Sequence, residues 1–210
     1  MTVAPPYRNA AIDSAALVIA PCIDDITLRH LGSVRRVFGE GAASDLTRNY
    51  VRARLPETIA EAATFTGVVL ADSACNAPLK ETSLPRENLP DLTMHLPDSG
   101  TTVSFSSGPP AFVLFLEDLT LGLHDVYHHG GGVAQRTMHR QLRLSARAAV
   151  WDNRAGRAVA YGHVEARASS SLTELTRATW DTVTQRFAHK LFGPTPFRHP
   201  DAGRFHWLLN

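Results

Sequence analysis

The sequence predicts one soluble α+β domain, in which a short mixed or antiparallel sheet is covered by an early helix and a C-terminal helix. Three observations predict this fold class. The 210 residues are 44% apolar and 20% charged, which suits one sizeable core spanning residues 1–210. Residues 141–168 alternate as a hairpin, and helical periodicity follows them. The earlier strand, helix and strand differ from the repeated βα units of a doubly wound sheet.

The first half is expected to hold two strands and one helix. Residues 16–23 are apolar on both faces and predict a central strand, whereas the glycines of residues 28–44 predict an irregular connection. Pro56 must kink the following helix or begin a second one, because it lacks an N–H group. Residues 68–71 predict the second strand. The apolar stripe of the helix comprises Leu46, Tyr50, Ile59 and Ala62.

Residues 75–110 contain six prolines and show little periodicity. We expect a long proline-rich loop with one or two short edge strands, such as residues 101–105. Loops of this length in a compact domain are usually functional or mobile. We also expect residues 1–14 to form a flexible N-terminal arm and residues 194–210 a C-terminal tail. The aromatic residues of the tail predict that it packs on the body of the protein.

The second half predicts three strands in succession. Residues 111–123 are rich in Phe, Val and Leu, and residues 124–139 form a glycine-rich connection. Residues 141–151 then alternate, residues 152–156 form a turn and residues 157–168 return. The inward face of the first hairpin strand is expected to carry Leu142, Leu144, Ala146, Ala148 and Val150.

The last helix has the clearest local signals. Ser171 and Glu174 have the spacing of a capping box, and Gly193 with Pro194 stops the helix. Between them, apolar residues recur at helical spacing. This stripe comprises Leu172, Leu175, Thr179, Val183, Phe187 and Leu191.

Charge and targeting signals narrow the partners. A net charge of +1 removes the usual electrostatic argument for nucleic acid or an acidic membrane surface. Residues 15–23 are too short to cross a bilayer. Residues 1–9 lack the pattern of a signal peptide, so the protein is cytoplasmic or an export signal preceded Met1. Cys22 and Cys75 lie in unlike settings and are expected to be unpaired thiols.

Four histidines, His124, His128, His129 and His139, surround three consecutive glycines. Imidazole is the commonest transition-metal ligand, but no His-Glu-x-x-His or paired Cys-x-x-Cys frame is present. Adjacent side chains of an extended segment point to opposite sides, so His128 and His129 are poorly placed to share one ion. We expect exposed imidazoles near a hairpin tip and assign no metal, with these four residues as the alternative ligands.

Catalytic frames are also missing from the sequence. The glycine run lacks the Lys-Ser/Thr ending of a phosphate-binding loop, and no Gly-x-Ser-x-Gly elbow occurs. Asp24 and Asp25 follow the first strand and could hold a cation or a catalytic proton, although strand-end carboxylates commonly cap turns. We therefore assign no catalytic residue and no cofactor.

The hairpin supplies the candidates for partner contact. Arg143 and Arg147 form a basic stripe with Arg157 and Arg167, or a guarded sheet edge. Trp151 and Tyr161 are contact candidates because aromatic side chains are favoured at interfaces. Packing in the core is the alternative for both aromatics.

The hairpin segment RLSARAAVWDNRAGRAVAYGHVEA resembles the strand–turn–strand of small bacterial envelope lipoproteins. These include the curli-secretion lipoprotein, the Pel-polysaccharide lipoprotein and the outer-membrane activators of penicillin-binding proteins. The order of elements over residues 15–193 is similar, with the opening strand ALVIAPCID and the closing helix SLTELTRATWDTVTQRFAHKLFG. The chain departs from the pattern in having no lipidation cysteine at its start and in its longer proline-rich loop.

The resemblance implies a non-catalytic accessory protein on the periplasmic side of the bacterial envelope. It would dock onto export, polymer-secretion or cell-wall proteins or onto a second copy of itself, and any membrane attachment would come from a lipid anchor outside residues 1–210. One alternative is a metal-dependent or hydrolytic enzyme that uses the His124–His139 connection with Asp24, Asp25 or Asp125. A cytoplasmic small-ligand binder is a further alternative.

Overall fold

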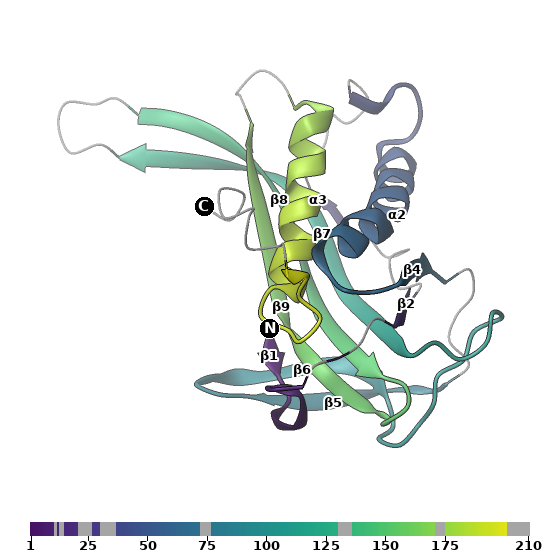
Figure 1. Cartoon of the computed structure of the whole chain (residues 1–210). Helices are drawn as coiled ribbons and strands as arrows, with labels where there is room; N and C mark the ends of the chain where they lie inside the picture. The colour runs from purple at the N-terminus through teal and green to yellow at the C-terminus, as the bar shows by residue number, and fades with distance from the viewer. Residues whose placement is uncertain are drawn as a thin grey trace.

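The computed structural model describes residues 1–10, 12, 15–20, 27–29, 37–71, 77–129, 136–170 and 175–200, of which 29, 125–129, 136–139 and 170 are described for their backbone only. Figure 1 shows the helices on one face of a long twisted sheet and a separate, smaller sheet at the bottom of the view. The α+β prediction, with an early and a C-terminal helix covering a mixed sheet, is confirmed.

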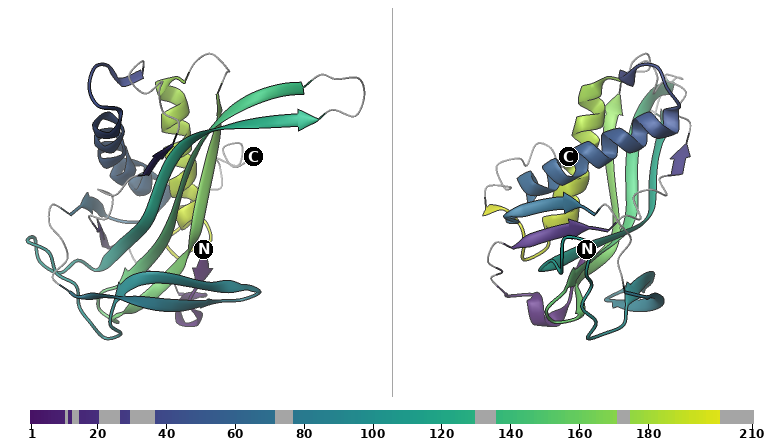
Figure 2. Two further views of the ribbon diagram at one scale, coloured as in Figure 1. Left: turned by 180° about the vertical axis from the view of Figure 1, so that it is seen from behind. Right: turned by 90° about the vertical axis from the view of Figure 1, so that its right-hand side faces the viewer.

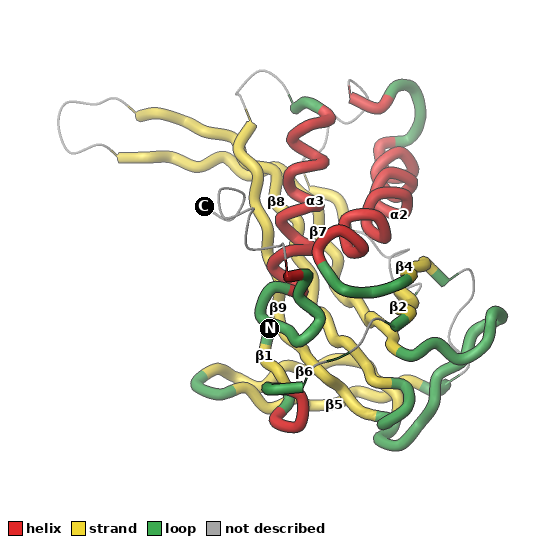
Figure 3. The backbone as a smooth tube through the Cα atoms, in the orientation of Figure 1, coloured by secondary structure: helices red, strands yellow, loops and turns green. Residues whose placement is uncertain are grey.

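The main sheet is mixed and has seven strands within the described residues, in the order β1-β9-β8-β7-β2-β4, with β3 also paired to β7. The three long strands β7, β8 and β9 are antiparallel, whereas β2 runs parallel to both β4 and β7. Figure 3 shows how far the long strands extend. The strands are β1 (Thr2–Val3), β2 (Ala16–Ile19), β3 (Thr27–Arg29), β4 (Gly67–Leu70), β7 (Phe112–His129), β8 (Arg136–Asp152) and β9 (Arg157–Ser170).

The alternation predicted for β8 is confirmed. Even-numbered residues of β8, from Leu142 to Val150, are buried in the core between sheet and helices. Odd-numbered residues therefore lie on the opposite side, which we call the outer face. The expected opening strand is shorter, because β2 ends at Ile19 and residues 21–26 lie outside the described range. Strand β3 falls at the start of a segment for which the sequence predicted only an irregular connection.

The early helix α2 (Ala43–Ala62) is continuous, so Pro56 neither ends it nor begins a second helix. A proline inside a helix costs about 3 kcal/mol. Leu55 and Ile59, on either side of Pro56, are fully buried, and each contributes about 1.5–3 kcal/mol of burial, which offsets that cost.

The C-terminal helix α3 (Arg177–Phe192) begins later than the sequence predicted. Its N-cap is Thr176, whose Oγ accepts a hydrogen bond from the backbone N–H of Thr179 at 3.4 Å. The predicted capping box at Ser171 and Glu174 lies outside the described residues. The stop is as predicted, because α3 ends at Phe192, just before Gly193 and Pro194.

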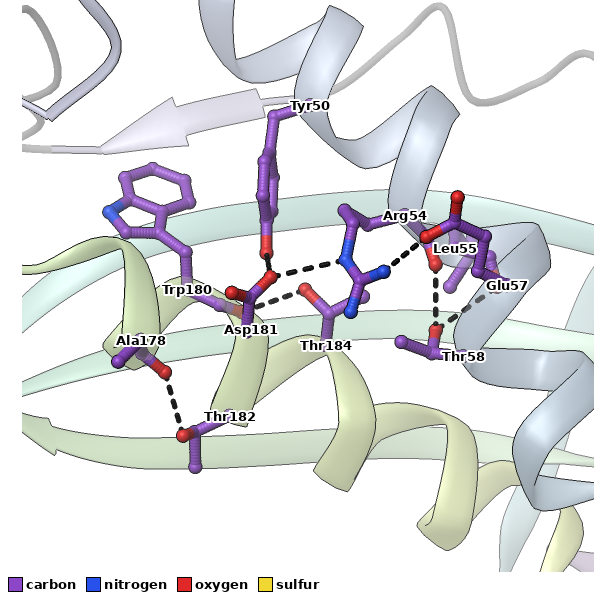
Figure 4. A network of polar contacts seen from close by, with 10 residues as sticks. All are labelled: Tyr50, Arg54, Leu55, Glu57, Thr58, Ala178, Trp180, Asp181, Thr182 and Thr184. Carbon is purple, nitrogen blue, oxygen red and sulfur yellow. Dashed lines mark hydrogen bonds and ion pairs between the residues drawn. The ribbon is translucent and has the colours of Figure 1, made fainter.

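A polar contact joins the two helices above the sheet (Figure 4). The Tyr50 hydroxyl donates to the Asp181 carboxylate at 2.7 Å, and Arg54 Nε donates to the same oxygen at 3.1 Å. Burial, followed by this hydrogen bond, raises the pKa of Tyr50 above its ordinary value. The contact ties the middle of α2 to the first turns of α3, so both helices hold a defined position on the sheet.

The described part of the C-terminal tail, residues 194–200, packs on the body through Phe197. Phe197 stacks on Phe65 with 4.8 Å between ring centroids, and Phe192 meets Phe65 edge to face at 5.4 Å. Phe112 of β7 completes this cluster. The remaining aromatic residues of the tail, Phe205 and Trp207, lie outside the described residues.

The sequence predicted a proline-rich loop over residues 75–110, and this prediction is wrong for the middle of the segment. Leu79–Arg86 (β5) and Leu89–Pro97 (β6) form an antiparallel hairpin across the outer face. Figure 2 shows this hairpin on the side away from the helices. A two-stranded sheet has two open edges, so prolines fit without breaking its ladder. Residues 101–105 are not a strand, apart from a bridge between Phe105 and Gly108.

The predicted flexible arm over residues 1–14 is also partly wrong. Thr2 and Val3 pair with β9, and Pro5–Tyr7 form a short 3-10 helix. The Tyr7 hydroxyl then donates to the Asp152 carboxylate at 2.8 Å. Strand addition and this side-chain contact attach residues 1–10 to the sheet.

Candidate functional site

The outer face of the main sheet changes character along its length. At one end the β5–β6 hairpin covers an apolar patch, and at the other end β7 and β8 continue as a two-stranded projection. Between them lies a polar region that no described residue covers.

The covered end contains both aromatic residues that the sequence proposed for partner contact. Trp151 is 3% and Tyr161 6% exposed, in a cluster with Met94, Leu96 and Phe115. The Tyr161 hydroxyl donates to the Pro85 carbonyl at 2.6 Å. Burial raises the pKa of Tyr161 above its ordinary value. Both aromatics therefore pack in the core under the hairpin and are not available to a partner on this face.

Arg147 holds the hairpin to the sheet. Its guanidinium donates to the Thr93 carbonyl of β6 and forms ion pairs with Glu117 at 3.2 Å and Asp118 at 2.8 Å. Glu117 Oε1 in turn accepts the backbone N–H of His95 at 2.7 Å. These bonds show that Arg147 joins the two sheets. The sequence had placed Arg147 in an exposed basic stripe and did not predict this role.

A bulge in β7 follows at Asp118. Glu117 pairs with Arg147 and Thr120 with Ser145, so two residues of β7 oppose one of β8, and Asp118 has φ +51°. The extra residue reverses the alternation of β7. Leu119, Leu121 and Leu123 consequently point into the core, and Thr120 and His124 reach the outer face.

A shallow depression of about 190 Å³ opens on this part of the outer face. Gly122 of β7 lies opposite Arg143 of β8 in the ladder, so β7 contributes no side chain to the space beside the guanidinium. Two hydroxyls, one imidazole and one guanidinium line the opening, and all lie on adjacent strands. The lining residues are Thr120, His124, Arg143 and Ser145.

A short row of charges borders the depression. Arg143 Nη2 contacts Glu165 Oε2, and Arg167 Nε lies 2.5 Å from the other oxygen of the same carboxylate. Two guanidinium groups thus share one carboxylate, which leaves a local excess of one positive charge. The sequence proposed Arg143 as a contact residue, and it lies at this opening with 35% of its side chain exposed.

The sequence predicted that all four histidines lie in one glycine-rich connection, but they do not. Strand β7 continues to His129 and β8 begins at Arg136, so all four occupy strand positions. His139 pairs with Val126 in the ladder, and His124 with Gln141. The side chains of His128, His129 and His139 lie outside the description, as do Cys22, Asp24, Asp25 and Cys75. Among described side chains, no group of three His, Cys, Asp or Glu residues could hold a metal ion.

Sequence reasoning missed Thr120 and Ser145 as site residues. The leucines at 119, 121 and 123 were a usable signal, because they predict that residues 120, 122 and 124 share the other face. Which of these positions meet Ser145 depends on the bulge and the register, and no local pattern specifies either.

Comparison with known proteins adds little beyond this geometry. No family model matches the sequence, and no curated protein matches it. A solved homolog of neuraminyllactose-binding hemagglutinin from Helicobacter pylori is 7% identical, with 89% of this chain and 83% of that chain covered and a TM-score of 0.36. The hypothetical protein CT253 from Chlamydia trachomatis is 10% identical, with 86% and 94% covered and a TM-score of 0.34. Likeness at this level carries no functional argument.

No helix within the described parts of the chain combines the length and apolar character needed to cross a membrane.

Proposed function

We propose that this protein is a non-catalytic accessory protein of the bacterial cell envelope, which acts by docking onto a protein partner through the end of the β7–β8 hairpin. We call this end the arm and define it as the paired residues 126–129 of β7 and 136–139 of β8. The resemblance of the hairpin sequence to envelope lipoproteins supplies the cellular setting. The geometry of the arm supplies the mode of action.

The observation that carries this proposal is the loss of supporting strands toward the arm. Pairing of β7 with β3 ends at Gly122, and pairing of β8 with β9 ends at Arg140. Among the residues that the structure describes, β7 and β8 pair only with each other beyond these points, up to His129 opposite Arg136. Figures 1 and 2 show this ribbon projecting away from the helices and the sheet.

A two-stranded ribbon is marginally stable in water, because it buries little apolar surface. A protein that carries such a projection gains stability for it by contact with another surface. Both open edges of the ribbon also present backbone N–H and C=O groups to which a partner strand can add. A docking arm on a rigid body follows from these two properties.

Removal of the arm tests the docking role. Asp125 and Arg140 face each other in the ladder, so Asn-Gly in place of residues 126–139 closes the shortened hairpin with a two-residue turn. The β3 and β9 pairings remain, so we expect the thermal midpoint to change by less than about 3 °C. A photo-crosslinking residue at Thr137 of the intact protein should give a discrete adduct in cells of the source organism, whereas one at Arg154, on the far turn, should not.

Two results would refute the docking role. One is the same adduct pattern from Thr137 and Arg154. The other is full function in cells that carry only the shortened protein. The envelope setting has its own test, which is the fractionation of the natural gene product and its digestion by protease added to the periplasm. A product protected from that protease, with Met1 as its first residue, would remove the envelope part of the proposal and leave the docking part standing.

A further inference from the structure

We propose that the depression lined by Thr120, His124, Arg143 and Ser145 is a binding site for a small oxyanion, with phosphate as its best chemical match. We call it the anion site. It stands independently of the docking proposal, because its residues belong to the sheet and none belongs to the arm. Its evidence is the set of donors, the local charge and the size of the opening.

The donors come from β8. Arg143 uses one terminal nitrogen on Glu165, and a guanidinium carries five N–H donors, so others remain for a second acceptor. Ser145 is 8% exposed and lines the depression, so its hydroxyl is a second polar group at the opening. A serine hydroxyl carries one O–H donor that an oxyanion can accept. Its position beside the guanidinium makes an anion the favoured ligand.

Strand β7 supports the same ligand class. The Thr120 hydroxyl lines the depression and donates its one proton to the Asp118 carbonyl at 3.1 Å, so it must rotate away from that carbonyl to donate to an oxyanion. His124 adds an imidazole to the lining. The absence of a side chain at Gly122 gives an oxyanion access to the edge of the guanidinium, where two parallel N–H groups can bind two oxygens.

The local charge favours an anion over a neutral ligand. Glu165 balances only one of the two arginines that contact it. Two other carboxylates of β7, Glu117 and Asp118, are engaged by Arg147. A volume of about 190 Å³ accommodates a phosphate group with a few waters, and it is too small for a nucleotide.

Titration with inorganic phosphate at constant ionic strength tests the anion site. We expect saturable binding, measured by calorimetry and by amide chemical-shift changes centred on Ser145 and Thr120. Arg143→Gln should weaken binding at least about tenfold and Ser145→Ala about threefold to tenfold, the loss expected for a charge-assisted hydrogen bond. Arg154→Gln makes the same charge change at an exposed turn residue and should leave affinity within about twofold.

Glu165→Gln guards against loss of binding through misfolding. It removes the carboxylate that competes for Arg143, so the affinity for phosphate should rise about threefold or more. Saturable binding that is unchanged in Arg143→Gln and Glu165→Gln would overturn the assignment. So would a response that chloride reproduces, or the absence of saturation up to about 50 mM phosphate. A glycerol phosphate probe with the same affinity would assign the site to the phosphate group itself, as expected.

Discussion

Replacement of Asn153 by alanine should destabilise the protein strongly, because this side chain holds the loop after β6 to the end of β8. The Asn153 amide nitrogen donates to the carbonyls of Val103 at 2.7 Å and Pro110 at 2.8 Å. Its amide oxygen accepts the backbone N–H of Val103 at 2.6 Å. Asn153 is 2% exposed and Val103 fully buried. No water can therefore replace the bonds to Val103 without a change in packing.

The magnitude follows from the groups left without partners. Asn153→Ala orphans the N–H and C=O of Val103, at about 1–3 kcal/mol each, and the Pro110 carbonyl at the low end of that range. These terms add to about 3–7 kcal/mol, and because neighbouring orphaned groups are not fully additive we expect a loss of about 3–5 kcal/mol in the free energy of unfolding. At about 2–4 °C per kcal/mol for a chain of this size, the thermal midpoint should fall by roughly 6–20 °C.

Urea denaturation followed by circular dichroism measures this loss, with calorimetry for the midpoint. Asn153→Asp is the matched control, since it keeps the shape and the acceptor but places an anion against two carbonyls. Its destabilisation should be larger at pH 7 than at pH 3, where the protonated carboxyl regains one donor. A loss below about 1 kcal/mol for Asn153→Ala would refute the reasoning, as would a destabilisation of Asn153→Asp, relative to the wild type, that is the same at pH 3 and pH 7.

Three further perturbations test other parts of the structure. Burial, followed by the hydrogen bond to the Asp152 carboxylate, raises the pKa of Tyr7 to about 12. The contribution of Tyr7 to the free energy of unfolding is therefore complete below pH 10 and is lost as the pH rises to 12. Tyr7→Phe should remove this pH dependence of stability between pH 10 and pH 12. Burial lowers the pKa of His189 below 6.5, so as the pH falls the unfolded state takes up the proton first. The stability of the protein should therefore decrease below pH 6.5, and the decrease should be smaller in His189→Gln. Urea midpoints at several pH values measure both. Gly156→Ala would place Cβ 2.4 Å from Gly100 Cα at φ +61°, whereas Gly108→Ala meets open space at φ +99°; calorimetry should find the first more destabilising by at least about 1 kcal/mol. Equal losses at both glycines would contradict the predicted backbone clash.

Local patterns predicted the elements whose apolar spacing is regular. Periodicity predicted the even-numbered face of β8 and the buried stripe of α3 at Val183, Phe187 and Leu191. The stop signals predicted the end of α3 at Phe192, just before Gly193. These features depend on residues three or four apart, or on alternate residues. The residues that the sequence proposed for partner contact differ in their surroundings. Arg143 lies at an opening, whereas Trp151 and Tyr161 are buried.

The sequence by itself therefore determined the fold class and the inward faces of the hairpin and the closing helix, because alternation and helical spacing are properties of neighbouring residues. Only the tertiary structure decided that residues 79–97 form a hairpin over Trp151. It also decided that the pairing of β7 with β8 continues past the described pairings with β3 and β9. It alone brought Thr120 beside Ser145 across a bulge. Register and the packing of one sheet on another depend on contacts between residues distant in the chain. Their free energy appears only when the partner surface is already in place.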